Sequence, residues 1–453
     1  MINKSYLINI SSTKRLLCFI YLLFIKLSTH IEQGVLVSNI LGLKAYFSIS
    51  TIEVGTFGSI LFIGNTVGCL ILFILINKFN RKYLLITSII TTVITLYILT
   101  KLQSNFISFI IRFILGITNS FIDVYIPIYI EQCSINKYKS FMMAIHHSFE
   151  PLGYLCGYIL NIYTSWDEAF LIQNILMLLI LIIIVLYTDD DLFNVNKTTS
   201  NIHSLYNQCL HCIQTPLFSL VTLSLTFAYF IISGIQIWLS DYLENTIQLT
   251  ETYTRVYIFL LIYIPSSICG ILFGGVIINY ICKGYHTKHA IVPPLICSIL
   301  SAFIAYFVIR VNDVYTFSIC MWLYLFCNAF VIPGLNGIVL SSVSKENVAA
   351  ASVLNVAIIN AFGKFSAPNI YGYLKDKYYN VNNKCAMWWL VNAIHGSILL
   401  LGVSTWVNYS SYFYKENNED NKIQGVNKEE QLQQIELVNR NIHIEREVDI
   451  NKQ

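Results

Sequence analysis

Four residues that could hold charge or permit close packing share one face of an apolar segment. The stripe consists of Arg112, Gly116, Asn119 and Asp123, at positions i, i+4, i+7 and i+11, which is the spacing of one helix face. Arg112 and Asp123 would lie about 16 Å apart along the axis, so each needs a partner from another helix. Two interpretations stay open: an anion anchor with a protonatable group, or a buried ion-pair network that locks helices together.

A second stripe of the same spacing lies in the next apolar segment and consists of His146, Glu150, Gly153 and Gly157. Carboxylates and imidazoles inside membrane spans can relay protons. Glycines let a neighbouring backbone approach closely. The alternative is a neutral, hydrogen-bonded Glu150 that only supports packing. His147 lies off this stripe and is expected to take no part.

Further ionisable residues interrupt two other apolar segments. The first segment contains Lys26 and Glu32, and a late segment contains Lys364 with Asn360 on the same face. A charge near the bilayer centre costs about 2.5–3.5 kcal/mol on insertion scales, so each of these residues needs a reason to be there. Lys26 could extend its ammonium group to the membrane surface, whereas Lys364 lies too near the middle of its segment.

The composition places these segments in lipid. Of 453 residues, 56% are hydrophobic and only 12% are charged, against about 25% charged in an average soluble domain. The net charge of +3 does not indicate nucleic-acid binding. Most of the twelve cysteines lie inside apolar runs, where cysteine behaves as a small hydrophobe. The sequence predicts no metal site and no cofactor.

Apolar windows of about 20 residues, the length that crosses a bilayer, recur twelve times. We therefore predict an all-α membrane protein with twelve transmembrane helices in two pseudo-symmetric six-helix bundles, the layout of many transporters. The expected division is an N-terminal segment at 1–15, a first bundle at 16–187, a central loop at 188–215, a second bundle at 216–408 and a polar tail at 409–453.

Lysine and arginine in the short connections indicate the orientation. With the N-terminus inside, the cytosolic side of the first half would hold nine of them: Lys4, Lys14, Arg15, Lys78, Arg81, Lys82, Lys137, Lys139 and Lys197. The other side of that half holds only Lys44 and Lys101. We therefore expect both termini in the cytosol, in a plasma membrane or an endolysosomal-type membrane.

No enzymatic signature is found. The sequence has no glycine-rich phosphate loop, no His-Glu-x-x-His and no nucleophile elbow, and we predict that the chain is not an enzyme. Without a nucleotide-binding motif, transport would be secondary or facilitative. A non-transporting membrane receptor or scaffold is the alternative from another class.

The connection after the second span resembles a conserved cytosolic loop of the major facilitator superfamily. It reads Asn77-Lys78-Phe79-Asn80-Arg81-Lys82, where the family has Asp-Arg-x-Gly-Arg-Arg. The resemblance implies a gating role for Asn77, Lys78, Arg81 and Lys82. Asn77 stands in place of the acidic residue, so the family's usual charge relay would lack its acid.

Other motifs resemble the Spinster-like branch of lysolipid and sphingolipid transporters. They cover much of residues 28–376 and are Glu32-Gln33-Gly34-Val35-Leu36, Arg112-Phe113-Ile114-Leu115-Gly116, Gly234-Ile235-Gln236-Ile237-Trp238 and Gly363-Lys364-Phe365-Ser366-Ala367-Pro368. The resemblance implies that Glu32 takes the place of a proton-linked aspartate. Lys364 inverts the charge that the branch usually has there. A sugar porter is the nearest competitor, because Pro127 to Glu131 resembles the end of that group's fourth helix.

These observations give one set of predicted site residues. Substrate would be bound by Arg112, Asn119, Asp123, Trp238 and Lys364, and protons would be exchanged by Glu32, Glu150 and His146. The expected substrate is a small organic or lysolipid-like solute, because the first half supplies a charged wall and the second half is expected to supply an apolar, aromatic one. The expected partners are the lipid bilayer, this solute and protons, with the chain acting as a monomer. A sugar or another polar metabolite is the alternative solute.

Overall fold

The computed structural model describes residues 12–39, 42, 46, 48–101, 104–134, 138–188, 190–193, 202–249, 252–378 and 384–410. The described residues contain helices and no strand. Ser404 ends one compact unit, and the residues from Thr405 form a second. The helical arrangement described below belongs to the first unit.

The first half contributes six long helices, which are α1 (Ser12–Ser38), α3 (Thr51–Lys78), α4 (Arg81–Lys101), α5 (Asn105–Cys133), α6 (Lys139–Tyr163) and α7 (Trp166–Tyr187). Capping boxes begin two of them: Ser50 and Glu53 exchange hydrogen bonds at α3, and Ser165 and Glu168 do so at α7. Such caps satisfy amide groups that have no partner within the helix. The starts of α3 and α7 are therefore encoded by nearby residues.

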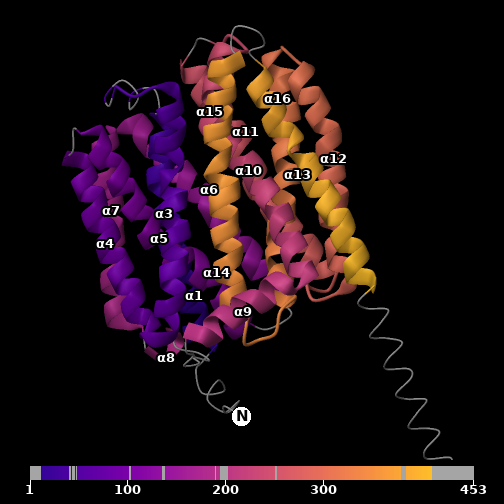
Figure 1. Ribbon diagram of the computed structural model, residues 1–453. Helices are drawn as coiled ribbons and strands as arrows, with labels where there is room; N and C mark the ends of the chain where they lie inside the picture. The colour runs from indigo at the N-terminus through magenta and orange to yellow at the C-terminus, as the bar shows by residue number, and fades with distance from the viewer. Residues whose placement is uncertain are drawn as a thin grey trace, which may run out of the picture. The chain divides into compact units, whose positions relative to one another are not determined.

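The second half repeats the pattern with more interruptions. Its spans are α10 (Pro216–Asn245); α11 (Thr252–Val276) with the π-helix η3 (Ile277–Ile281); the 3₁₀ turn η4 (Lys288–Ile291) with α12 (Val292–Arg310); α13 (Val314–Ser341); α14 (Val348–Ile358) with the π-helix η5 (Ile359–Lys364) and α15 (Ser366–Tyr378); and α16 (Cys385–Asn392), which continues within this unit over 394–404. Between the halves lie two short helices, α8 (Asp190–Phe193) and α9 (Ile202–Gln214). We call the end of the bundles where these two lie the α9 end (Figure 1).

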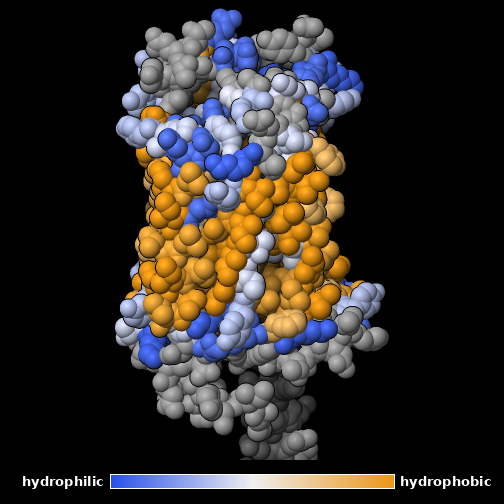
Figure 2. Space-filling model, turned by 90° about the vertical axis from the view of Figure 1, so that its left-hand side faces the viewer, coloured by the Kyte–Doolittle hydropathy of each residue, from blue (hydrophilic) through white to orange (hydrophobic). Residues whose placement is uncertain are grey.

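Eleven of the described helices are long and apolar enough to cross a membrane. With α6 they make the predicted twelve. Helix α6 has 25 residues but falls outside that group, because it carries Lys139, His146, His147 and Glu150 within its length. Figure 2 shows the apolar side chains of the viewed face as a band between hydrophilic ends, as expected of helices that face lipid. The predicted fold class is confirmed.

Glycines of both predicted stripes allow close helix contacts. A Cβ atom added to Gly157 of α6 would lie 1.9 Å from the Ile31 carbonyl oxygen of α1, and one added to Gly116 of α5 would lie 2.0 Å from the Leu61 carbonyl oxygen of α3. Both neighbours are backbone atoms, so no side chain can move aside. The prediction that Gly157 permits close backbone approach is confirmed, and this contact explains how α1 and α6 bring their charged residues together.

Candidate functional site

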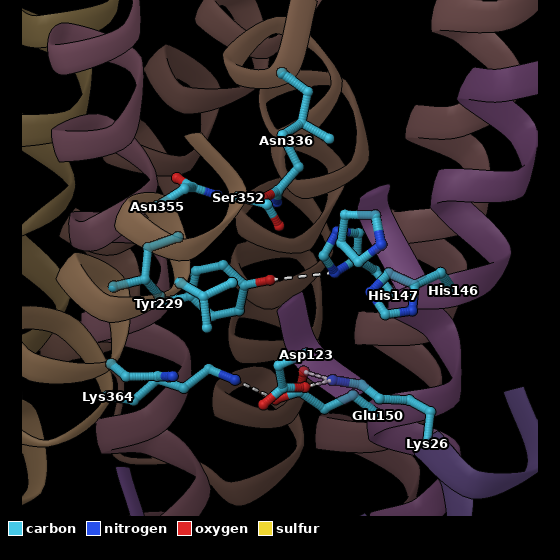
Figure 3. A pocket seen from close by; sticks show the side chains of 15 residues that line it. Lys26, Asp123, His146, His147, Glu150, Tyr229, Asn336, Ser352, Asn355 and Lys364 are labelled. Carbon is cyan, nitrogen blue, oxygen red and sulfur yellow. Dashed lines mark hydrogen bonds and ion pairs between the residues drawn. The ribbon is translucent and has the colours of Figure 1, made fainter. Parts of the chain in front are cut away.

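A small polar cavity lies between the two halves, with a volume of about 40 Å³. That space holds a few water molecules and no larger solute. The first half supplies α1, α5 and α6, and the second half supplies α10, α13, α14 and η5 (Figure 3). The lining residues are Lys26, Asp123, Pro127, His146, His147, Glu150, Tyr229, Asn336, Leu340, Ser352, Asn355, Val356, Ile359, Asn360 and Lys364.

Two lysines and two carboxylates form one ion-pair network in this cavity. Lys26 pairs with Asp123, and its ammonium nitrogen lies 3.6 Å from Glu150 Oε2. Lys364 Nζ lies 2.6 Å from Glu150 Oε1. Asn65 donates a hydrogen bond to Asp123. The formal charges sum to zero, because two positive and two negative groups meet. Buried charges are tolerated in such balanced, hydrogen-bonded sets.

The pair between Lys364 and Glu150 joins the two halves of the chain. Lys364 is the last residue of the π-helix η5, and the Phe365 amide bonds back to the Asn360 carbonyl. A π-helical turn often marks a functional position. The Lys364 ammonium also lies 4.8 Å from the centre of the Tyr229 ring. The charge that looked inverted in the sequence is therefore compensated by a carboxylate from the opposite half.

Lys26 does not extend to the membrane surface. It is 3% exposed and belongs to the central network, so the snorkelling interpretation is wrong. The reason is the close contact of α1 with α6, which places the Lys26 ammonium beside Glu150. Sequence spacing within α1 could not reveal this neighbour.

Arg112 and Glu32 form a second ion pair, at 2.9 Å, and both are fully buried. Arg112 also donates to the Phe57 carbonyl oxygen, at 2.8 Å, and its guanidinium carbon lies 4.9 Å from the centre of the Phe57 ring. All these partners belong to the first half, and neither Arg112 nor Glu32 lines the cavity. The expectation that Arg112 and Asp123 each find a partner on another helix is confirmed, since α1 supplies both partners.

The structure places Asn119 and Trp238 away from the cavity lining. Asn119 is buried in α5, at 4% exposure. Trp238 donates from Nε1 to the Pro368 carbonyl oxygen, at 3.0 Å, and stacks on Tyr371 with ring centres 5.2 Å apart. Of the eight residues predicted to bind substrate or exchange protons, four line the cavity: Asp123, His146, Glu150 and Lys364.

Several lining residues were missed by sequence reasoning. His147 lines the cavity and lies 3.3 Å from the Tyr229 hydroxyl, so the expectation that it takes no part is wrong. The second half also contributes an amide pair, in which Asn355 donates to Asn336 at 2.8 Å. The wall of the second half is therefore polar here, not apolar as expected. Asparagines inside apolar runs were the signal that could have found this pair.

The basic loop after α3 is held by the segment that follows α7. Lys82 pairs with Asp190 at 3.3 Å, and Asn80 donates to the same carboxylate at 2.9 Å. Arg81 is 2% exposed and donates to the Phe193 carbonyl oxygen at 3.4 Å. Asp190 thus supplies a carboxylate that the motif itself lacks. The side chain of Asn77 lies outside the described residues.

Contacts between the halves close the end opposite α9. Within the second half, Lys375 Nζ lies 2.6 Å from Asp241 Oδ2, and this pair holds α15 against α10 beside Trp238. Across the halves, Thr56 of α3 donates to Asn369 of α15 at 2.6 Å. A Cβ atom on Gly55 would lie 2.8 Å from the Pro368 carbonyl oxygen. Helices α3 and α15 therefore lie in direct contact at this end.

At the α9 end, the turn after η3 reaches the first half. Tyr285 is buried, and its hydroxyl donates to Glu131 at 2.5 Å, while Lys139 pairs with the same carboxylate at 2.7 Å. Burial raises the pKa of Tyr285, which keeps the phenol protonated as a donor. Burial lowers the pKa of His286, whose Nε2 lies 4.0 Å from Glu131, so that this imidazole is neutral at pH 7. Hydrogen bonds between the two halves are thus present at both ends of the cavity.

The two sets of contacts lie at opposite ends of the cavity and should loosen independently of each other. We expect Tyr285→Phe to speed amide hydrogen exchange in residues 282–287, because the bridge to Glu131 is lost. We expect Thr56→Val to speed exchange around Asn369 of α15 instead, because the hydrogen bond across the halves is lost. Peptide-resolved hydrogen exchange by mass spectrometry checks both. Equal acceleration at both ends in either variant would contradict separate closures.

The sequence matches the model of the Major Facilitator Superfamily over residues 22–368. The chain belongs to this family of membrane transporters. Its two halves of six long helices each have the layout of this family. No curated protein matches the sequence significantly.

Solved structures of transporters share the fold. The human organic anion transporter MFSD10 (TETRAN) superposes with a TM-score of 0.68 at 13% identity, over 86% of this chain and 100% of that one. A bacterial homologue of the human lysosomal transporter Spinster, inward-facing and unoccupied, gives 0.59 at 13% identity, over 89% and 97%. The Escherichia coli fucose:proton symporter FucP gives 0.62 at 11% identity, over 86% and 99%. These similarities concern the fold.

Proposed function

We propose that this transporter carries a small organic anion together with a proton, and that Lys364 and Glu150 couple the two. The observation that supports this proposal is their 2.6 Å ion pair between the halves, in a cavity whose charges balance. An arriving anionic group competes with Glu150 for the Lys364 ammonium. Glu150 then takes a proton, because a buried carboxylate without a cation is costly.

The charges support one proton for each negative charge carried. The network of two lysines and two carboxylates is neutral, an anion adds one negative charge, and a proton on Glu150 restores neutrality. His146 lines the same cavity and is the second group that we propose for proton exchange. Asp123 stays paired with Lys26 and, in this proposal, keeps that lysine from holding the anion. Arg112 and Glu32 position α1 and α5.

One structural neighbour is named as an organic anion transporter and another as a fucose:proton symporter. These names are consistent with the proposal, but the proposal does not rest on them.

A lysolipid-like amphiphile is the second candidate solute. An apolar groove of about 490 Å³, lined by residues of α10, α15 and α16 such as Phe230 and Trp389, has room for an acyl chain. The Spinster-like motifs favour the same solute.

Uptake into proteoliposomes tests the proposal. We expect a labelled small carboxylate or organic phosphate to enter faster when the outside is acidic, and Lys364→Met to remove this uptake. A labelled hexose and a labelled lysolipid serve as competitors in the same vesicles. Hexose or lysolipid uptake without anion uptake would contradict the anionic substrate. Folded protein that moves none of them would favour the receptor or scaffold alternative.

We further propose that the α9 end and both termini of the chain face the cytosol. The supporting observation is that Lys78, Arg81, Lys82 and Lys139 lie at helix ends on this side, in keeping with the excess of positive residues in cytosolic loops. A tag placed in the C-terminal tail should be protected from a protease added outside intact cells. Cleavage of that tag without permeabilisation would reverse the orientation. The plasma membrane and an endolysosomal-type membrane stay equal proposals.

A further inference from the structure

Helix α9 presents three distinct faces along its described side chains. One face is packed: Cys212 is 0% exposed, and its thiol lies 3.9 Å from the Asn347 carbonyl oxygen. A second face is polar and exposed, and consists of Asn207, His211 and Gln214. The third face is apolar and exposed, and consists of Tyr206, Leu210 and Ile213, with 65%, 40% and 52% exposure. Each exposed face has the i, i+4, i+7 spacing.

The position of α9 brings the apolar face to the membrane surface. Helix α9 is 13 residues long, about 20 Å, which is too short to span a bilayer. Thr215 alone separates it from Pro216, the first residue of the span α10. Figure 1 shows α9 running obliquely across the ends of the spans. Its C-terminus must therefore lie where α10 enters the lipid.

We propose that α9 lies in the surface of one leaflet, with Tyr206, Leu210 and Ile213 in the acyl-chain boundary and Asn207, His211 and Gln214 in water. Such a three-sided pattern suits a helix at the rim of a bundle, with protein, lipid and water on separate sides. The helix contains no Lys, Arg, Asp or Glu. The attachment therefore depends on apolar partition and not on the charge of the lipid head groups.

This attachment has a consequence for the site. The packed face of α9 meets Asn347, the N-cap of α14, and His211 Nδ1 lies 3.5 Å from Asn347 Nδ2. Helix α14 continues into η5, which carries Lys364. Anchoring α9 in the leaflet holds the N-terminus of this helix at the level of the membrane surface while the halves move.

Photo-crosslinking of the full chain in phosphatidylcholine vesicles tests the proposal. The photoreactive residue p-benzoylphenylalanine replaces Leu210 or Ile213, and Asn207 or Gln214 provides the matched control on the polar face. We expect lipid adducts at least several-fold more abundant at Leu210 and Ile213. Replacement of Tyr206, which keeps an aromatic ring, gives a second apolar position if a Leu210 variant does not fold.

Three results would overturn the proposal. Equal lipid labelling of the two faces would show that neither is turned to the bilayer. Cross-links from Leu210 to the chain itself or to a second copy would identify a protein occupant. Adducts that form only when anionic lipid is added would point to head-group charge as the cause.

Discussion

Glu150→Gln should reduce uptake driven by a pH gradient to less than about a tenth of the wild-type rate. Glutamine keeps the shape of the side chain but cannot neutralise Lys364 or exchange a proton. Removing one partner of a buried ion pair costs about 3–5 kcal/mol, and about 1.4 kcal/mol corresponds to a factor of ten in an equilibrium. The closed conformation, in which the 2.6 Å pair joins the halves, should be depopulated accordingly. Proteoliposome uptake and hydrogen exchange around η5 measure the two effects.

Two further variants separate coupling from folding. The double variant Glu150→Gln/Lys364→Gln restores a neutral, hydrogen-bonding pair, so we expect it to fold and close but not to respond to a pH gradient. Glu346→Gln, at an exposed position between α13 and α14, is the matched control and should behave as wild type. Wild-type, pH-dependent uptake by the double variant would show that the pair only supports structure.

Gly157→Ala should prevent α1 and α6 from docking and should greatly reduce the yield of folded protein. The added methyl carbon would lie 1.9 Å from the Ile31 carbonyl oxygen, a backbone atom within a helix that cannot yield without moving α1. Overpacking typically costs about 1–3 kcal/mol, and more where the backbone must shift. Separation of the two helices would also pull Lys26 away from Glu150. Thermal unfolding in detergent and size-exclusion profiles give the measurement.

Gly402→Ala is the control for that variant, because an added Cβ there meets nothing within 4 Å. Alanine is the better helix former by about 1 kcal/mol, so this variant should be as stable as wild type or slightly more so. A stable, transporting Gly157→Ala protein would mean that α1 and α6 do not approach as closely as described.

The amino-acid sequence by itself determined the spans, the halves and the family. Lipid requires each spanning backbone to satisfy its own hydrogen bonds, so span length and apolar character are local properties that sequence windows capture. The close contact at Gly157 was predictable for a similar reason, since glycines at regular spacing on one helix face let a neighbouring backbone approach. The position of Asp123, Glu150 and Lys364 in a polar interior was also predictable, because a charge inside lipid is costly.

Only the tertiary structure decided which charged side chains form ion pairs with one another. Helix periodicity tells which residues share a face but not which neighbouring helix that face touches. Lys26 and Glu32 both lie on α1, yet one belongs to the cavity network and the other pairs with Arg112 inside the first half. The partner of Lys364 lies 214 residues away in the sequence, and the Asn336–Asn355 pair joins two different spans. These contacts depend on helix docking, because the energy of a buried charge is set by its nearest neighbours in space and not in sequence.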